Sequence, residues 1–117
     1  MNFEDIYSHC TSKQFATEDY PFDTSTLVFK VGGKLFLLID SDNPNSINVK
    51  CDPEKVTELR ENYSCVLPGY HMNKTHWNTI VCDGSVNNKL IESWIDDSYN
   101  LVVSGLTKKL KTELDNL

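Results

Sequence analysis

The clearest local pattern in the chain is Thr26-Leu27-Val28-Phe29-Lys30-Val31-Gly32-Gly33-Lys34-Leu35-Phe36-Leu37-Leu38-Ile39. Two apolar runs flank a glycine pair, and paired glycines supply the positive φ angles that a two-residue hairpin turn requires. The pattern therefore predicts a β-hairpin. Uninterrupted pairing across the turn predicts one face composed of Leu27, Phe29, Val31, Lys34, Phe36 and Leu38, and a second face composed of Thr26, Val28, Lys30, Leu35, Leu37 and Ile39.

Both predicted faces of this hairpin are apolar, whereas a half-solvated antiparallel strand should alternate between apolar and polar residues. Two interpretations stay open. Either the sheet is covered on both sides, or one face is an interaction surface. In the second case we expect a partner or homodimer surface around Leu35, Leu37 and Ile39.

Periodicity predicts the remaining elements. Apolar residues at helical spacing predict helices over residues 2–14, 53–63, from 83–85 to Gly105, and over 107–117. Further strands are predicted over 46–51, 66–72 and 77–82, and residues 15–23 are predicted to form a connector with anchoring aromatic residues. The order indicates a single α+β domain over residues 1–117, with two layers arranged as α-β(3)-α-β(2)-α and a five-stranded antiparallel sheet packed on helices.

Composition limits the classes of function. The chain has 117 residues, a formal charge of −6 and no apolar run near the roughly 20 residues that span a bilayer. The first residues lack a basic start and an apolar core, so we expect a soluble, cytoplasmic protein without membrane contact. There is no phosphate-binding glycine motif and no paired cysteine spacing. We expect no enzyme activity, no cofactor and no metal, and interpret the four cysteines as reduced, mostly buried thiols.

The segment from Pro68 to Thr79 contains aromatic, amide and basic residues but no acid, although the chain has 17 acidic residues. A hairpin of this composition could hold phosphates by charge and stack on bases. The alternative is a structural hairpin in which Trp77 and Tyr70 fill the core. Residue chemistry alone favours the structural interpretation.

The same segment carries a family resemblance. Pro-Gly-Tyr-His-Met-Asn-Lys and His-Trp-Asn-Thr, within residues 68–79, resemble the signature of the MmcQ/YjbR family. Lys50-Cys51-Asp52-Pro53, Asp83-Gly84-Ser85-Val86 and the hairpin at 26–34 follow in the family's pattern. The resemblance implies a small fold grouped with CyaY-like and secretion-chaperone-like architectures. It also implies DNA binding, by likeness to the double-wing domain of a phage transcription factor.

On this resemblance, hairpins 71–78 and 30–34 become the candidate wings of a non-enzymatic DNA-binding protein that makes weak contacts with the DNA backbone. The candidate contact residues are Lys30, Lys34, Lys50, Tyr70, His71, Asn73, Lys74, His76, Trp77, Asn78, Lys108 and Lys109. Because the chain is acidic overall, the lysines must converge on one side of the sheet. The alternative function is a protein-interaction or chaperone-like adaptor module that uses an apolar hairpin face, as a monomer or weak homodimer.

Overall fold

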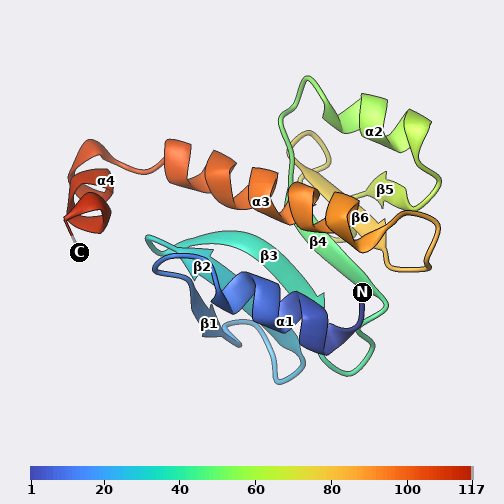
Figure 1. Cartoon of the computed structure of the whole chain (residues 1–117), viewed down its shortest axis with the longest axis horizontal. Helices are drawn as coiled ribbons and strands as arrows, with labels where there is room; N and C mark the ends of the chain where they lie inside the picture. Colours follow the sequence, from blue (N-terminus) through green and yellow to red (C-terminus); the bar gives the residue numbers. More distant parts are fainter. Residues whose placement is uncertain (117) are drawn as a thin grey trace.

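A layer of helices covers one face of a six-stranded antiparallel sheet in the computed structural model, which describes residues 1–116 (Figure 1). The strand order across the sheet is β1-β2-β3-β4-β6-β5. The elements are α1 (Phe3–Thr11), β1 (Thr17–Asp19), β2 (Thr26–Val31), β3 (Lys34–Asp40), β4 (Ser46–Lys50), α2 (Val56–Asn62), β5 (Val66–Pro68), β6 (Trp77–Val81), α3 (Asn88–Ser104) and α4 (Lys108–Asp115).

The predicted α+β class and the predicted order of helices are confirmed, and the sheet has one strand more than expected. The additional strand is β1, within the stretch predicted to be a connector; Glu18 lies opposite Phe29 on β2. All three β1 residues are exposed. An edge strand this short and polar has no apolar alternation, so the sequence carries no signal for it.

Two helices begin later than predicted because turns precede them. Before α2, the Asp52 carbonyl accepts from the amides of Lys55 and Val56, and the Asp52 carboxylate accepts from the Glu54 amide, so the first helical residue is Val56 rather than residue 53. Helix α3 begins after Asn87, whose side chain accepts from the Leu90 amide at 2.8 Å as an N-cap. Gly105 ends α3, as predicted.

A β-bulge in the central hairpin changes which side chains face the helices. Lys30 lies opposite Leu35 and Phe29 lies opposite Leu37, so Phe36 has no partner on β2. One extra residue shifts the alternation of β3 by one position. The predicted faces are therefore wrong beyond the bulge: Leu37 and Ile39 join the core beneath the helices, and Leu38 faces the other way.

Ser98 of α3 bonds the backbone at this bulge. The fully buried Ser98 hydroxyl donates to the Phe36 carbonyl at 2.5 Å and accepts from the Lys50 amide at 2.8 Å. One side chain thus satisfies two backbone groups, one on β3 and one at the end of β4. Buried backbone groups without partners are costly, so this bond anchors α3 across the two central strands.

The two faces of the sheet differ in how they are covered. The main core brings together Phe29, Phe36 and Ile95 with the apolar residues of α1 and α3. The opposite face carries a small second cluster made only of strand and loop residues: Val28, Leu38 and Trp77, with Leu35 and Met72 packed against it. Within residues 1–116 the helices cover one side of the sheet, so the interpretation with cover on both sides is wrong. The second interpretation, an interaction surface on one face, stays a prediction. No helix within residues 1–116 is long and apolar enough to cross a membrane.

The proposed partner surface at Leu37 and Ile39 is wrong. These side chains are 0% and 2% exposed and lie beneath the helices. Leu35, on the other face, is half-buried. Any partner that contacts the hairpin must use the face without helices.

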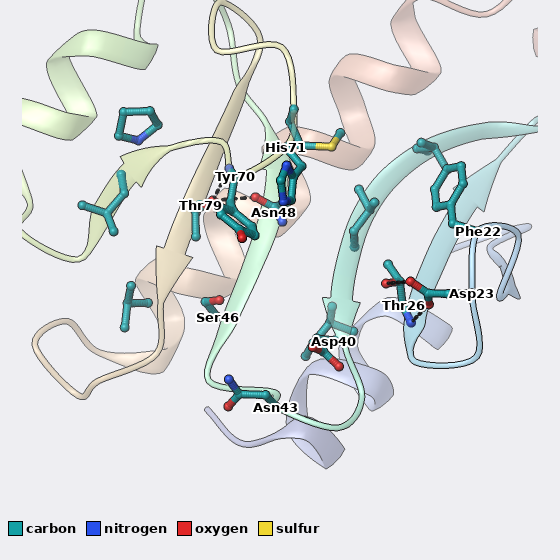
Figure 2. A pocket seen from close by; sticks show the side chains of 17 residues that line it. Phe22, Asp23, Thr26, Asp40, Asn43, Ser46, Asn48, Tyr70, His71 and Thr79 are labelled. Atoms are coloured by element: carbon teal, nitrogen blue, oxygen red, sulfur yellow. Dashed lines mark hydrogen bonds between the residues drawn. The ribbon is translucent and has the colours of Figure 1, made fainter.

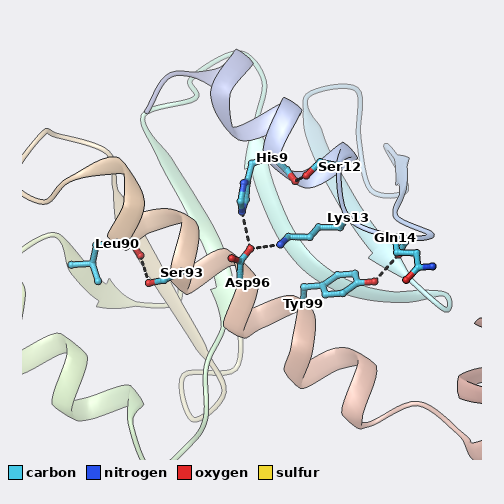
Figure 3. Close-up of polar contacts among 8 residues, drawn as sticks. All are labelled: His9, Ser12, Lys13, Gln14, Leu90, Ser93, Asp96 and Tyr99. Carbon is cyan, nitrogen blue, oxygen red and sulfur yellow. Dashed lines mark hydrogen bonds and ion pairs between the residues drawn. The ribbon is translucent and has the colours of Figure 1, made fainter. Parts of the chain in front are cut away.

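Polar contacts connect α1 to α3 (Figure 3). The Asp96 carboxylate lies 2.7 Å from His9 Nε2 and pairs with the Lys13 ammonium. The Tyr99 hydroxyl donates to the Gln14 carbonyl at 2.6 Å. Partial burial raises the pKa of Asp96, but hydrogen bonds from Lys13 and His9 outweigh it and bring the pKa below its ordinary value.

Replacing Ser98 with alanine should lower the free energy of unfolding by about 2–4 kcal/mol, because two buried backbone groups lose their partner. Urea denaturation measures this change. Ser93→Ala is the matched control, because Ser93 is exposed on the same helix and bonds only the Leu90 carbonyl one turn back. The control should change stability by less than about 0.5 kcal/mol. Equal effects of the two substitutions would contradict the role assigned to Ser98.

Asp96→Asn should lower the stability at pH 7 by up to about 1 kcal/mol, since the ion pairs of Asp96 are partly exposed. The folded pKa is lowered, so this stabilisation is present above the unfolded pKa of about 4 and is lost as the pH falls through the folded value. Thermal unfolding from pH 2 to 7 should show the two proteins converge at acidic pH. A constant difference across this range would contradict the assignment.

Candidate binding site

A groove of about 770 Å³ crosses the face of the sheet that has no helices, here called the open face (Figure 2). Figure 2 shows Phe22 and Asp23, from the loop before β2, on one side of the groove, and Tyr70 and His71, from the loop after β5, on the other side. This volume lies within the range of about 300–1,000 Å³ that is typical of ligand sites. Its size therefore makes the groove a candidate binding site.

The floor of the groove is a row of residues that lie opposite one another on neighbouring strands. Leu38 of β3 lies opposite Asn48 of β4, Asn48 lies opposite Thr79 of β6, and Thr79 lies opposite Leu67 of β5. The Thr79 hydroxyl donates to Asn48 Oδ1 at 2.5 Å and accepts from the Tyr70 amide at 2.9 Å. This network attaches the loop after β5 to the middle of the sheet.

Tyr70 and His71 form an exposed aromatic lip on one side of the groove. Tyr70 is 70% exposed, and its ring centroid lies 4.0 Å from that of His71. His71 has a φ of +56°, a left-handed conformation that is uncommon for residues other than glycine. Such a conformation persists only where the surroundings enforce it, and it often marks a functional loop.

Backbone bonds hold the lip in place. The Gly69 amide donates to the Trp77 carbonyl at 3.0 Å, and the Gly69 carbonyl accepts from the Met72 amide at 3.2 Å and from Lys74 Nζ at 3.0 Å. A Cβ at Gly69 would lie 2.9 Å from the backbone oxygen of Trp77, so this close approach requires glycine. The ammonium group of Lys74, a candidate DNA contact, therefore donates a hydrogen bond to the backbone of its own loop.

Two other candidate DNA contacts, Asn78 and Trp77, are buried inside the protein. Asn78 is 1% exposed and faces the helices, where its Oδ1 accepts from Arg60 Nε at 2.7 Å. Arg60 also donates to the carbonyls of Lys74 and Trp77, at 2.5 and 3.2 Å, and so connects α2 to the hairpin. Trp77 is 9% exposed in the cluster on the open face. These contacts agree with the structural interpretation of the hairpin for Trp77 and Asn78, whereas Tyr70 lies outside the core.

Charges on the open face are separated along the strands. Lys30 lies opposite Leu35, and Lys50 lies opposite Trp77, at the end of the face where β2 and β4 finish. Asp40 lies opposite Thr26 at the other end, and Thr26 Oγ1 donates to Asp23 at 3.0 Å. We call these the lysine end and the acidic end. Asp19 of the edge strand β1 lies opposite Val28, between the two ends. On β2, β3 and β4, lysine and aspartate side chains occupy opposite ends of the open face.

The remaining candidates do not gather into one surface. Asn73 and His76 shape the loop: Asn73 Oδ1 accepts from the Thr75 amide, and the His76 carbonyl accepts from the Cys51 amide. Lys34 is exposed at the hairpin tip, next to Gly32, which packs against Leu106. The exposed lysines 108 and 109 lie on α4, which Figure 1 shows at the opposite end of α3 from β5 and β6.

Several groove residues were not predicted from the sequence. Asn48, Thr79 and Asp40 come together only through strand register, which no linear motif records. Phe22 was predicted to anchor a connector, but it is 65% exposed beside the groove. Its position in Tyr20-Pro21-Phe22, an apolar group within a polar stretch, is the feature of the sequence that could have indicated an exposed aromatic residue.

The arrangement of the cysteines and of the side chains that could bind a metal ion bears on two further kinds of chemistry. Within residues 1–116, no group of three or more His, Cys, Asp or Glu side chains could hold a metal ion. The four cysteines are unpaired thiols, and burial raises the pKa of Cys10 to about 12. Burial also raises the pKa of Cys51 and Cys82. A raised pKa disfavours the reactive thiolate.

The fold and groove define a class: small α+β proteins with one helical layer and an open sheet face. The YjbR family model matches residues 11–101, and the chain belongs to this family. It is 39% identical to YbdF of Escherichia coli O157:H7 over 86% of this chain and 88% of that protein. It is 30% identical to YjbR of Escherichia coli K12 over the full length of both. Both relatives are described as uncharacterized.

Solved structures share this architecture. The crystal structure of the Deinococcus radiodurans protein DR2400 matches with a TM-score of 0.91 and 38% identity, over 97% of this chain and 88% of that one. A crystal structure of a Pseudomonas syringae protein matches with a TM-score of 0.74 and 30% identity, over 87% of this chain and 99% of that one. The family expected from the motifs in residues 68–79 is therefore confirmed.

Thr79→Val should release the Tyr70 lip while leaving the sheet intact, because valine keeps the shape of threonine but loses the hydroxyl that bonds Tyr70 and Asn48. We expect a loss of about 1–2 kcal/mol in unfolding free energy. Hydrogen exchange should be faster at the Tyr70 amide and unchanged in β3. Thr57→Val, at an exposed site on α2, is the control. Unaltered exchange at Tyr70 would contradict the network.

Proposed function

We propose that this chain is a non-enzymatic DNA-binding protein that contacts the phosphate backbone through the lysine end of its open face. The observation that carries the proposal is the separation of charge on that face, with Lys30 and Lys50 at one end and Asp23 and Asp40 at the other. Phosphate contacts are electrostatic and need a local cluster of cations.

The net charge of −6 limits the strength of this binding without excluding it. Many carboxylates lie away from the lysine end; for example, Glu58 and Glu61 are exposed on α2. Long-range repulsion is screened within about 10 Å at 0.1 M salt, so nearby lysines dominate at contact. Binding supported by few cations is weak, depends on salt and reads little sequence.

The twelve candidate contacts take different parts in this proposal. Lys30 and Lys50 are the phosphate contacts, and exposed Tyr70 and His71 can stack on an unpaired base. Trp77 and Asn78 support the hairpin from within, and Lys74 stabilises the loop that carries Tyr70. Stacking on unpaired bases favours single-stranded over double-stranded DNA.

The alternative function, a protein-interaction module, retains support on the open face only. The second apolar cluster and the exposed Phe22, Leu67 and Tyr70 lie along the groove there. A partner would bind the groove rather than the buried Leu37 and Ile39.

Fluorescence anisotropy with a labelled 20-nucleotide single strand and a 20-base-pair duplex tests DNA binding. We expect dissociation constants of about 1–100 µM at low salt, with tighter binding to the single strand. Lys30→Glu with Lys50→Glu should weaken binding at least tenfold. The slope of log K against log salt should fall in magnitude by about 1–2, because two phosphate contacts are lost.

The matched control is Lys55→Glu with Lys89→Glu, which changes the net charge equally at two exposed lysines outside the open face. It should weaken binding much less. Equal weakening by both double variants would show that net charge alone governs binding. That result, or no binding at low salt, would overturn the proposal.

A further inference from the structure

We infer that the groove binds an extended peptide of about six residues that carries apolar side chains and a lysine or arginine. The inference rests on the shape, lining and charge of the groove and does not depend on DNA binding. It assigns a ligand class to the acidic end of the open face, away from Lys30 and Lys50.

The dimensions fit an extended chain. The groove reaches from the loop before β2 to the loop after β5, across β3, β4 and β6. Four strand spacings of about 4.8 Å give a span of about 19 Å. An extended peptide rises about 3.3 Å per residue, so about six residues cross the groove.

The apolar lining accounts for part of the binding energy. Leu38 forms part of the apolar floor of the groove, and Met72 forms part of its wall. Phe22 and Leu67, which are 65% and 45% exposed, lie at its two sides. Exposed apolar side chains that border a concave surface can contact the apolar side chains of a ligand. Alternate side chains of an extended peptide point to one face, so two or three of them can contact this lining.

The charges define the rest of the ligand. Asp23 and Asp40 line the groove, and no lysine or arginine within residues 1–116 does so. The amides of Thr26 and Ser25 donate to the Asp23 carboxylate and lower its pKa, so this residue is ionised at neutral pH. A lysine or arginine of the peptide complements this end, whereas phosphates and fatty-acid carboxylates are repelled.

A hydrogen-bond donor completes the site. Thr79 donates to the Asn48 side-chain oxygen, and the NH₂ group of Asn48 makes no hydrogen bond within residues 1–116. This group lies on the groove floor and can donate to a carbonyl of the bound peptide. The loop that carries Tyr70 and His71 is already held by backbone bonds, so binding orders few additional groups.

Selection from a phage-displayed heptapeptide library against the whole protein tests the inference. We expect enriched sequences that combine apolar residues with lysine or arginine. The most enriched peptide is then synthesised and titrated by calorimetry. Tyr70→Ala, which removes the exposed ring of the lip, should weaken its binding about tenfold.

Charge variants locate the cationic residue of the peptide. Asp40→Asn keeps an oxygen for the Asp42 amide but removes the charge, and it should weaken binding about three- to tenfold. Glu113→Gln makes the same change on exposed α4 and should have no effect. Asp40→Asn should not weaken DNA binding, so the charged contact to the peptide is separable from the phosphate contacts of Lys30 and Lys50, while Tyr70 serves both ligands. No enrichment, enrichment of acidic peptides, or binding insensitive to both Tyr70→Ala and Asp40→Asn would overturn the inference.

Discussion

The architecture depends on the contact of the Ser98 hydroxyl with the Phe36 carbonyl and the Lys50 amide. Phe36 is the extra residue of the β3 bulge, and a bulge leaves backbone groups without strand partners. Ser98 supplies the missing partner from α3. The bulge in turn directs Leu37 and Ile39 to the helices and Leu38 to the open face, so a local backbone irregularity decides which surface is free.

The open face has two chemically different ends because its charged residues come from different strands and from the loop before β2. Lys30 and Lys50 come from the ends of β2 and β4, whereas Asp40 comes from the end of β3, which runs the opposite way. Antiparallel strands bring alternate chain ends together, so charges distant in sequence are sorted into two groups. DNA phosphates complement the first end and a cationic peptide complements the second.

The hairpin at residues 68–79 shows why residue type alone assigns site residues poorly. Tyr70 and Trp77 are both aromatic, yet Tyr70 is 70% exposed and Trp77 is 9% exposed. Asn78 and Asn48 are both amides, yet Asn78 bonds Arg60 beneath the helices and Asn48 lies on the groove floor. Strand pairing places Asn78 and Asn48 on opposite faces of the sheet, whereas Tyr70 is exposed because it lies in the loop after β5. The register depends on contacts with β4 and α2.

Local periodicity, turn residues and short motifs were enough to predict the α+β class, the Gly32-Gly33 hairpin, the order of the helices and the family. Three features could be seen only in the folded molecule: the edge strand β1, the face to which Leu37, Leu38 and Ile39 point, and the groove between Phe22 and Tyr70. A bulge, an edge strand and a groove all arise from pairing between different segments of the chain. Local residue preferences do not encode that pairing.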